Sequence, residues 1–483
     1  MKLSFKKHEK ELLIFLAVVT VLLRLLFLGY SDFYGDETKT FYQDKTIPAK
    51  EFLLDQRKGP MQFLVVWFTE KIIGGYHELW TRIPFGIAGV ISVFVLYLLV
   101  KSLYGWKTGI AAAYLFSVSG FFIAFSRTIQ YQSILILFGL SGILLFVKYV
   151  NQCKKKENCV LLLLSAISFS ASLLCHYDAV FFLIPIFYLV IRNKLKFIPI
   201  LVYFVAPFLL VASVFYIPYY TGGYFEDNTV NYVLRRMTGG DFSLNNSLYT
   251  YLVYNRTILA FYIFLVPFVL FFIKIKEKCM KLQLFWFISA LLIYELVILN
   301  PGTHIYIYVI PLTIMCGYSF VEIYEGISDR VGLKLANVLA VFVISVTLVN
   351  SLFIYVPRIN TGYPWNSKIS TKYHLYLYGF PYNRSWRELR KYFESKEGVR
   401  GIYTNDNDTI AQYYLNGIDY TPPGSNFLPQ FYIHVNNPQE FFIKDVNFNK
   451  VYKDYYEKEK EFTQGGLVLA EVYRLKGSSN THW

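Results

Sequence analysis

Two adjacent carboxylates, Asp36 and Glu37, follow directly on the first long apolar stretch of the chain, in the sequence YGDETKTFY (34–42). Charge near a membrane segment costs free energy, so acids in this position are expected to have a function. A carboxylate there can accept the proton of an attacking hydroxyl or amine, and adjacent acids can also share a divalent metal ion. The alternative is that Glu37 caps a short interfacial helix and that Asp36 is structural.

Cationic and other polar side chains stand at the ends of several later apolar stretches. Cations can bind a phosphate and neutralise its charge as it leaves. Each residue also has a structural alternative, because an arginine can reach lipid headgroups and a histidine at a helix end can simply be hydrogen-bonded. The residues are Lys58, Arg82, Arg127, Gln130, Gln132, His176, Asp178 and His304, with Arg235 and Arg236 in the stretch 219–250.

The composition indicates a membrane protein. Hydrophobic residues make up 55% of the 483 residues, charged residues only 17%, and the mean hydropathy is +0.38. The net charge of +14 is better explained by lysines in cytoplasmic loops than by binding to nucleic acid. The five cysteines have neither paired nor metal-type spacing, so they indicate no function.

Apolar stretches long enough to cross a bilayer recur over the first 355 residues. We expect eleven spans, at 12–30, 83–100, 108–125, 131–150, 159–175, 178–191, 197–218, 251–273, 282–299, 304–322 and 335–356. The stretch 61–75 is shorter and contains Glu70 and Lys71. We expect it to lie at the outer surface as an interfacial or re-entrant helix.

Loop charge predicts the orientation. Six connecting segments hold eighteen Lys and Arg against five Asp and Glu, at 1–11, 101–107, 151–158, 192–196, 274–281 and 329–334. By the positive-inside rule they are cytoplasmic, and they fall on one side only if 61–75 does not cross. The N-terminus is then cytoplasmic, and the polar residues Asp36, Lys58, Arg127 and His304 all belong to the outer face.

The chain changes character after residue 356. SWRELRKYFESK predicts a helix with Ser385 as its N-cap, and NDTIAQYYLNG a second helix that ends at Gly417. GVRGIYTN and GLVLAEVYRL are typical of strands. We therefore expect two domains, a transmembrane domain over 1–356 and a small soluble α/β domain over 357–483 on the extracytoplasmic side.

Several of these motifs, in this order, resemble those of a known family. GDE after the first span, KGPMQFLVVW, RIPFGIAGVISVFVLYLLVKSLYG, SGFFIAFSRTIQYQSILILFGL, LLCHYDAVFFLIP and THIYIYVIPLTIMCGYSF are similar to GT-C superfamily polyprenyl-phosphate-sugar glycosyltransferases. The nearest group is the protein O-mannosyltransferase and lipid A aminoarabinose-transferase type. The resemblance covers about residues 1–355 and implies a GT-C-like polytopic helical fold.

The resemblance implies roles for individual residues. Asp36 would be the catalytic carboxylate with Glu37 beside it, and Lys58, Arg82, Arg127 and His304 would bind the donor phosphate. His176, Gln132 and Tyr306 would contact substrate. The donor would be a sugar on a polyprenyl phosphate, and the acceptor a lipid, glycan or protein on the outer face of the cell membrane. Transfer would be inverting.

Two departures from the family bear on a metal. Many relatives have an aspartate about where Gln132 stands, and an amide cannot replace a carboxylate as a base or metal ligand. No metal ligand is therefore assigned, and a divalent metal stays an open alternative. His304 stands where relatives often have arginine or lysine. Unlike those residues, a histidine can lose its charge near neutral pH.

Two other functions stay open. One is a transporter or flippase for a lipid-linked substrate, which would place charges at mid-span and show symmetry between halves. The other is a non-catalytic envelope scaffold of the same fold, which Gln132 favours slightly. The charges stand at span ends, mostly on one face, so the glycosyltransferase is the leading hypothesis.

Overall fold

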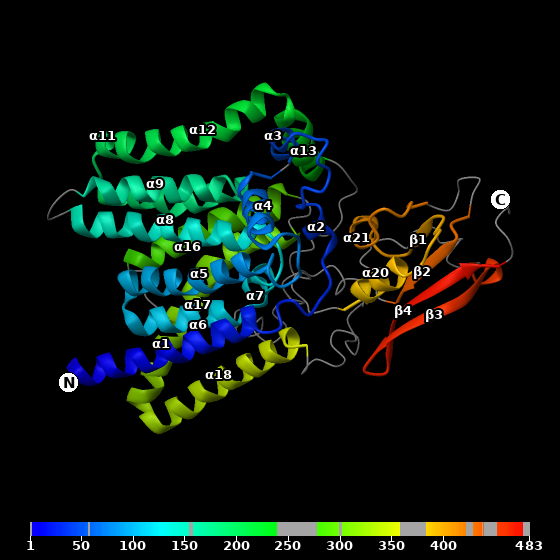
Figure 1. Cartoon of the computed structure of the whole chain (residues 1–483). Coiled ribbons are helices and arrows are strands. Elements are labelled where there is room, and N and C mark those ends of the chain that lie inside the picture. The colour runs from blue at the N-terminus through cyan, green and yellow to red at the C-terminus, as the bar shows by residue number, and fades with distance from the viewer. Residues whose placement is uncertain are drawn as a thin grey trace.

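The computed structural model describes residues 2–56, 58–153, 158–238, 278–298, 302–357, 383–421, 428–436, 438 and 452–476. Within these ranges, long helices form a bundle that meets a small unit of helices and sheet at one end (Figure 1). Six helices are long and apolar enough to cross a membrane, or seven when one bent pair counts as a span. The polytopic helical fold class is confirmed. The number of eleven spans stays a prediction, and the stretch 251–273 lies outside the described residues.

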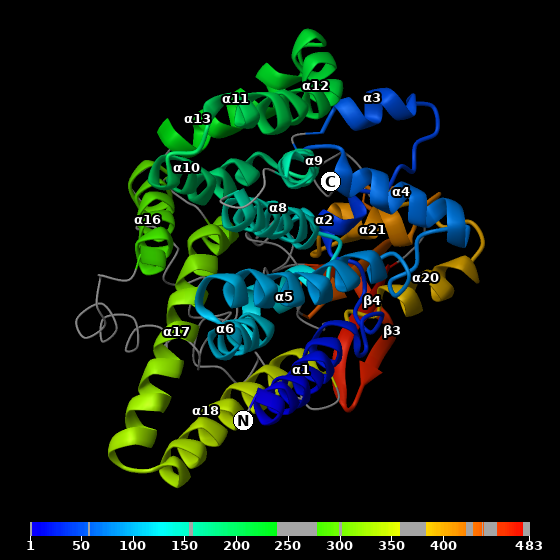
Figure 2. The ribbon, with the colours of Figure 1, turned by 90° about the vertical axis from the view of Figure 1, so that its left-hand side faces the viewer.

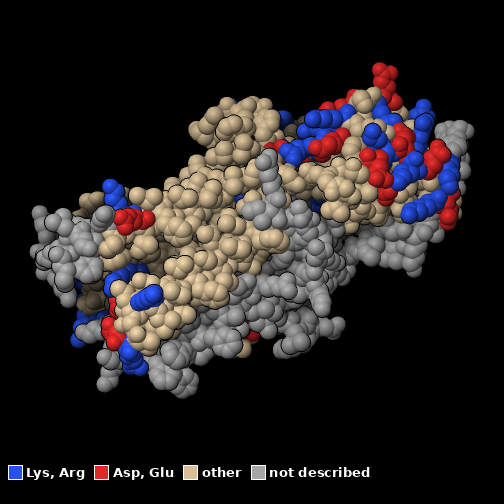
Figure 3. Space-filling model, turned by 90° about the horizontal axis from the view of Figure 1, so that it is seen from below, with Lys and Arg blue, Asp and Glu red and all other residues tan. Residues whose placement is uncertain are grey.

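The six candidate spans agree with the apolar stretches of the sequence. Their outward faces are apolar, with Leu210, Val214 and Phe342 more than half exposed, as expected of side chains that contact lipid. On the face in Figure 3, an uncharged belt separates the charged side chains of the two ends. The spans are α5 (Ile83–Tyr104), α8 (Tyr131–Cys153), α11 (Phe197–Ile200) with η2 (Leu201–Val205) and α12 (Ala206–Thr221), α16 (Lys278–Leu292) with η4 (Ile293–Val297), η5 (Gly302–Ile305) with α17 (Tyr306–Arg330), and α18 (Leu333–Tyr355).

The stretch 108–125, expected as one span, is two helices. α6 (Trp106–Val118) and α7 (Gly120–Ser126) meet at Ser119 with a bend of 63°. Arg24 of α1 (Lys2–Leu25) donates hydrogen bonds to the carbonyl oxygens of Ser117, at 3.0 Å, and Phe116, at 3.4 Å. The last carbonyls of a helix have no partner within it, so the buried guanidinium stabilises the end of α6 at the bend.

Three other apolar stretches differ from the expected spans. The first, expected at 12–30, is helical over Lys2–Leu25. The stretch 159–175 forms α9 (Cys159–Leu173), and 178–191 begins with the 3-10 turn η1 (Tyr177–Phe182) before α10 (Leu183–Asn193). After α12 the chain continues through η3 (Phe225–Val230) and α13 (Asn231–Thr238).

The stretch 61–75 forms α4 (Met61–Ile73), which has 13 residues. At 1.5 Å per residue it is about 20 Å long, which is too short for a hydrocarbon core of about 30 Å. It lies at the end of the bundle that faces the C-terminal unit, near α2 (Gly35–Thr38) and α3 (Ala49–Leu54) (Figure 1). Its length agrees with the expected interfacial position.

The C-terminal unit contains α20 (Trp386–Glu394), α21 (Asp408–Tyr414) and a four-stranded sheet. The strands are β1 (Ile402–Thr404), β2 (Phe431–Val435), β3 (Tyr456–Gln464) and β4 (Leu467–Leu475). Their order is β1-β2-β4-β3, with β1 parallel to β2 and the other pairs antiparallel. Both predicted helices and both predicted strands are present, but the Ser385 side chain makes no capping hydrogen bond.

This unit packs on the loop that follows α1. The Tyr414 hydroxyl accepts from Phe33 N at 2.8 Å and contacts Glu78 Oε1 at 2.7 Å. Thr409 donates to the Gly35 carbonyl at 3.3 Å, which places α21 against α2 (Figure 2). A Cβ atom on Gly35 would lie 2.8 Å from Asn407 Oδ1, so no larger residue fits there without movement. The loop that carries Asp36 is therefore held between the helix bundle and the C-terminal unit.

The buried carboxyl of Asp32 lies in the same interface and gives a prediction about pH. Its Oδ2 accepts from the backbone nitrogens of Arg384, at 2.8 Å, and Trp386, at 3.2 Å. Burial raises its pKa to about 6, because the hydrogen bonds and Arg387 offset only part of the cost of removing the charge from water.

A raised folded-state pKa means that the folded protein binds the proton more tightly than the unfolded chain. Stability from Asp32 is therefore present below pH 4 and is lost as the pH rises through about 6. The shift from 3.8 corresponds to roughly 3 kcal/mol at most. Thermal unfolding of Asp32→Asn should lack this component over pH 4–7. Parallel curves for variant and wild type would contradict it.

Candidate functional site

Glu37 is fully buried and forms an ion pair with Arg82. Arg82 donates from Nε to Glu37 Oε1 at 2.8 Å and from Nη2 to Oε2 at 2.7 Å. Glu37 also accepts from the backbone nitrogens of Tyr34, at 2.6 Å, and Ile129, at 2.8 Å. A carboxylate with four donors already in place is poorly suited to accept a substrate proton. Its catalytic role stays a prediction, and this geometry favours a structural one.

Arg82 and Arg127 are also occupied by the protein itself. Beyond Glu37, Arg82 donates to the carbonyl oxygens of Leu28, Ser31 and Asp32 at 2.8–3.1 Å. Arg127 donates to carbonyl oxygens just before and after the end of α1, those of Leu23, Leu26 and Phe27, at 3.0–3.3 Å. Both residues are at most 4% exposed. Their contact with a donor phosphate stays a prediction, and in this structure both side chains support the loop after α1.

Asp36 differs from its neighbour. It lies on the same helical turn, α2, but its side chain is 32% exposed, whereas that of Glu37 is inaccessible. Its Oδ1 lies 3.1 Å from Lys39 Nζ on the next turn. Of the two predicted catalytic acids, Asp36 is thus the one that an acceptor can reach.

Five other predicted or neighbouring residues gather around one buried carboxylate, that of Asp178. Its Oδ1 accepts from the Tyr294 hydroxyl at 3.1 Å, and its Oδ2 accepts from the Tyr306 hydroxyl at 3.1 Å. Oδ2 also lies 2.7 Å from His304 Nδ1. We call Tyr131, His176, Asp178, Tyr294, His304 and Tyr306 the Asp178 cluster. It brings together residues of α8, of η1 and its N-cap His176, of η4, of η5 and of α17.

The two histidines of this cluster have different environments. His176 Nδ1 accepts from the backbone nitrogen of Asp178 at 3.1 Å, so this nitrogen carries no proton and its 3.2 Å approach to Asp178 Oδ1 is not a hydrogen bond. His304 Nδ1, by contrast, faces Asp178 Oδ2, which favours a proton there and leaves Nε2 as the other ring nitrogen. The His304 side chain is 11% exposed. His304 is therefore the histidine arranged to contact a ligand.

Lys58 lies over the same cluster. Its Nζ is 4.9 Å from the ring centre of Tyr131, which stacks on His176 with ring centres 4.2 Å apart. The Tyr131 hydroxyl lies 3.4 Å from His304 Nδ1. Two of the four residues predicted to bind phosphate, Lys58 and His304, thus contact one tyrosine ring, while Arg82 and Arg127 belong to a separate structural group.

Close backbone contacts join this cluster to the loop of Asp36. Glu37 accepts from Ile129 N, and the Ile129 carbonyl accepts from Gln62 Nε2 at 3.0 Å, two residues before Tyr131. Gly59 passes so near the turn before His176 that a Cβ atom would lie 2.1 Å from the Leu174 carbonyl. The Asp36 loop, Lys58 and the Asp178 cluster are therefore parts of one region.

Buried glutamines in this region have unused hydrogen-bonding capacity. Among the described residues, Gln62 Oε1, Gln130 Nε2 and Gln132 Oε1 are buried without a partner. Buried polar atoms without a partner cost free energy, so each of these atoms is suited to meet water or a polar ligand. The predicted substrate role of Gln132 stays a prediction, with this capacity in its favour.

Among the described residues, His176, Asp178 and His304 form a group that could hold a metal, with candidate ligand atoms within 4.8 Å of one another. Several of their polar atoms are already used, because His176 Nδ1 accepts a backbone N–H and Asp178 accepts two tyrosine hydroxyls. A metal ion would have to displace these donors, so the arrangement fits a hydrogen-bonded cluster better than a coordination site.

We therefore expect ligand binding and turnover to survive removal of divalent metals. Treatment of the purified protein with EDTA, followed by exchange into metal-free buffer, should leave both within about twofold of the untreated sample. Activity that is lost on chelation, restored by Zn²⁺ or Mn²⁺, and absent in His176→Gln would contradict this assignment.

The sequence analysis gave Asp178, Tyr131 and Tyr294 no role. Asp178 was visible as an acid in the turn HYD, two residues after His176. Its partners Tyr294 and Tyr306 are 116 and 128 residues away, and no spacing in the sequence indicates that they meet. The sequence signal for Asp178 is an acid between two apolar stretches, a position in which a charged residue is expected to have a function.

Comparison with known proteins identifies the fold. ArnT from Cupriavidus metallidurans bound to undecaprenyl phosphate superposes with a TM-score of 0.62 at 9% identity, covering 95% of this chain and 97% of ArnT. Its apo structure gives 0.59 at 8% identity, with the same coverage. The chain has the GT-C fold.

Further matches are more limited. Residues 57–217 match the model of the dolichyl-phosphate-mannose-protein mannosyltransferase family. The Archaeoglobus fulgidus oligosaccharyltransferase AglB, in complex with an inhibitory peptide and a dolichol-phosphate, gives a TM-score of 0.49 at 11% identity over 98% of this chain and 75% of AglB. No curated protein sequence matches. The predicted resemblance to GT-C proteins is confirmed, and the ArnT structure was solved with undecaprenyl phosphate bound.

Proposed function

We propose that this GT-C protein is a membrane glycosyltransferase that transfers one sugar from a polyprenyl-phosphate donor to a lipid, glycan or protein acceptor. The observation that carries the proposal is the joining of Asp36, Lys58 and His304 in one region by the Glu37–Ile129 hydrogen bond and the Gly59–Leu174 contact. ArnT, the relative with the same fold over almost its whole length, was solved with undecaprenyl phosphate bound.

In the proposed reaction the acceptor hydroxyl or amine attacks the anomeric carbon of the donor sugar. Asp36 accepts the proton of the attacking group as the new bond forms. The bond from the anomeric carbon to the phosphate oxygen breaks, and the electron pair leaves with the polyprenyl phosphate. Lys58 and His304 stabilise this developing negative charge. A single displacement of this kind inverts the anomeric configuration.

The Asp178 cluster would orient His304. A carboxylate beside Nδ1 fixes the orientation of the ring, so that Nε2 faces the donor, and the doubly protonated ring can offer an Nε2–H to the phosphate. The hydroxyls of Tyr294 and Tyr306 hold the carboxylate in place. Asp178 therefore acts as a positioning residue, and Tyr306 acts through Asp178 rather than on substrate directly.

The same proposal includes the topology. The cationic loops at the end of the bundle away from the C-terminal unit favour a cytoplasmic N-terminus. Residues 1–356 would then be the transmembrane domain, and residues 357–483 an extracytoplasmic domain. Its contacts with the loop after α1 would support the catalytic loop from outside.

Lys58→Met provides a direct test. We expect this change to weaken undecaprenyl phosphate binding and to lower turnover by about 10²–10³-fold, because a charge aimed at the leaving phosphate is lost. Binding is measured by the thermal shift that undecaprenyl phosphate produces, and turnover by the polyprenyl phosphate released from a set of undecaprenyl-phosphate sugars.

Lys50→Met is the matched control, because Lys50 is an exposed lysine of α3 in the same outer segment. It should bind and turn over like the wild type. Wild-type binding by Lys58→Met would eliminate the assignment of the phosphate site, and the absence of release from every donor in the set would count against the enzymatic function.

A further inference from the structure

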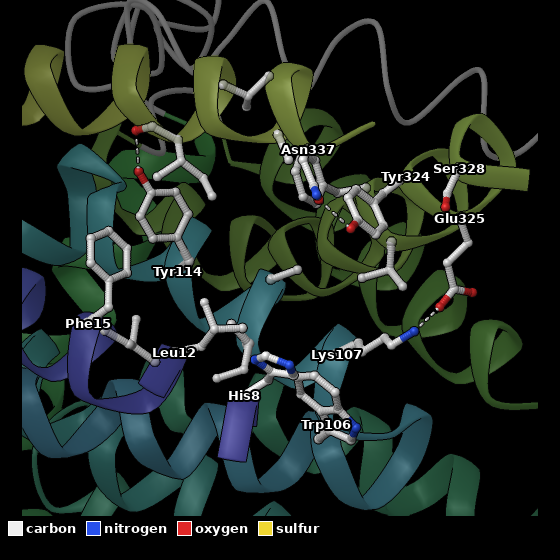
Figure 4. Close-up of a pocket in the computed structure, with 18 of the residues that line it drawn as sticks. His8, Leu12, Phe15, Trp106, Lys107, Tyr114, Tyr324, Glu325, Ser328 and Asn337 are labelled. Atoms are coloured by element: carbon white, nitrogen blue, oxygen red, sulfur yellow. Dashed lines mark hydrogen bonds and ion pairs between the residues drawn. The ribbon is translucent and has the colours of Figure 1, made fainter. Parts of the chain in front are cut away.

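A crevice lies between α1, α6, α17 and α18, at the end of the bundle away from the C-terminal unit (Figures 1 and 4). Its volume is about 920 Å³. None of its lining residues belongs to the Asp36 loop or the Asp178 cluster. It is therefore separate from the proposed catalytic region.

The crevice exists because, in the described residues, the hydrogen bonds of α18 to α6 and α7 come from its second half. The Tyr114 hydroxyl of α6 donates to the Ile344 carbonyl at 2.7 Å, and the Tyr355 hydroxyl donates to the Gly120 carbonyl of α7 at 2.8 Å. Toward its other end, α18 contacts α17 instead, where the Tyr324 hydroxyl donates to Asn337 Oδ1 at 2.7 Å. A wedge-shaped space therefore opens between α1 and α6 on one side and α17 and α18 on the other.

The polar and the apolar residues that line the crevice lie at different levels along the helices. On α6 the polar Lys107 is followed by the apolar Ile110 and Leu115, so the apolar part extends roughly 12 Å from Lys107. α17 runs the opposite way and has Glu325 and Asp329 at the same end as Lys107. Polar groups at one level and apolar groups beyond them match an amphiphile that lies along the helices.

The position agrees with a membrane interface. Trp106 lines the polar end of the crevice (Figure 4), and tryptophan is enriched where lipid headgroups meet the hydrocarbon. Three apolar residues of the lining itself are partly exposed, Leu12 at 40%, Phe15 at 37% and Leu333 at 57%. A lipid can thus reach the crevice from the bilayer.

Charge at the polar end selects the kind of headgroup. The lining has three carboxylates, those of Glu11, Glu325 and Asp329, against one lysine and one histidine, His8, whose Nδ1 lies 3.4 Å from Glu11 Oε2. Lys107 Nζ is already 2.6 Å from Glu325 Oε1. The surplus of carboxylates disfavours an anionic lipid and suits a primary ammonium group, which has three N–H donors.

We propose that this crevice binds one phosphatidylethanolamine molecule from the bilayer. Its ammonium group would interact with Glu11 and Asp329, its phosphate would join the Lys107–Glu325 pair, and an acyl chain would lie between α1, α6, α17 and α18. The site is independent of the proposed transfer reaction. This end of the bundle would then depend on a bound lipid that takes no part in the transfer reaction.

Native mass spectrometry of the full chain tests the proposal. The protein is released from nanodiscs with equal amounts of phosphatidylethanolamine and phosphatidylglycerol. We expect one phosphatidylethanolamine per chain, retained over phosphatidylglycerol. The double variant Glu11→Gln/Asp329→Asn should lower this preference about tenfold, the scale of one lost charge-assisted hydrogen bond. Glu322→Gln, an exposed acid of α17 that does not line the crevice, should keep it.

A second test fills the crevice with a larger side chain, and its outcome does not depend on the lipid headgroup. Ala340 lines the crevice, whereas Val341 faces away from it. Ala340→Trp should lose the retained lipid, and Val341→Trp should keep it. Preferential retention of phosphatidylglycerol or of a polyprenyl phosphate would overturn the assignment. Lipid retention by Ala340→Trp equal to that of the wild type would also overturn it. So would an unchanged preference for phosphatidylethanolamine in the well-folded double variant.

Discussion

Replacement of Asp36 by asparagine should reduce sugar transfer by about 10²–10⁴-fold, the contribution typical of a positioned general base. The amide keeps the shape of the side chain and an oxygen that can accept from Lys39, but it cannot take up the proton of the acceptor. Because the Asp36 side chain is 32% exposed, we expect the variant to fold normally.

The measurement separates chemistry from binding. Asp36→Asn should give the wild-type thermal shift with undecaprenyl phosphate, while release of polyprenyl phosphate from the glycosylated donor is lost. Asp44→Asn is the control, since Asp44 is an exposed acid of the same loop that accepts from its neighbour Thr46. Wild-type turnover in Asp36→Asn would eliminate the proposed mechanism.

The second large effect concerns the Glu37–Arg82 pair. Arg82→Met leaves the Glu37 carboxylate buried without its counter-ion, which typically costs about 3–5 kcal/mol. It also leaves the carbonyls of Leu28, Ser31 and Asp32 without a donor. We expect a strong fall in the unfolding temperature and in the yield of folded protein.

Three further variants make this result specific. Glu37→Gln/Arg82→Met removes both charges and should recover part of the stability lost by Arg82→Met alone. Lys458→Met breaks exposed ion pairs with Glu461 and Glu471 and should leave the unfolding temperature almost unchanged. If Glu37→Gln were as stable as wild type and yet inactive, Glu37 would be catalytic rather than structural.

Much of the fold follows from local sequence. The apolar stretches of α5, α8 and α18 are long enough to specify spans, and the α21 helix follows from its polar cap Asn407 and its apolar positions. The bend between α6 and α7 does not follow, because Ser119 is an ordinary residue and the guanidinium that stabilises the bend comes from Arg24, 92 residues earlier or more.

The candidate site was only partly predictable for a similar reason. In the sequence Asp36 and Glu37 are equivalent acids, and Arg82, Arg127 and Lys58 are equivalent cations. Their difference depends on which of them face carbonyl groups in the folded chain, as both arginines do. Asp178 stands out in the sequence only as a polar residue at the end of an apolar stretch, and its role could not be predicted because its tyrosine partners come from α17 and η4, far along the chain.

The contacts of Tyr414 have a consequence for biosynthesis. The loop that contains Phe33 and Asp36 emerges early during translation, yet Tyr414 and Thr409, which cover it, are made more than 370 residues later. Throughout that interval the nascent chain must keep this loop exposed without aggregation. A ribosome that stops before residue 414 therefore releases an inserted bundle whose earliest loop has nothing to close it.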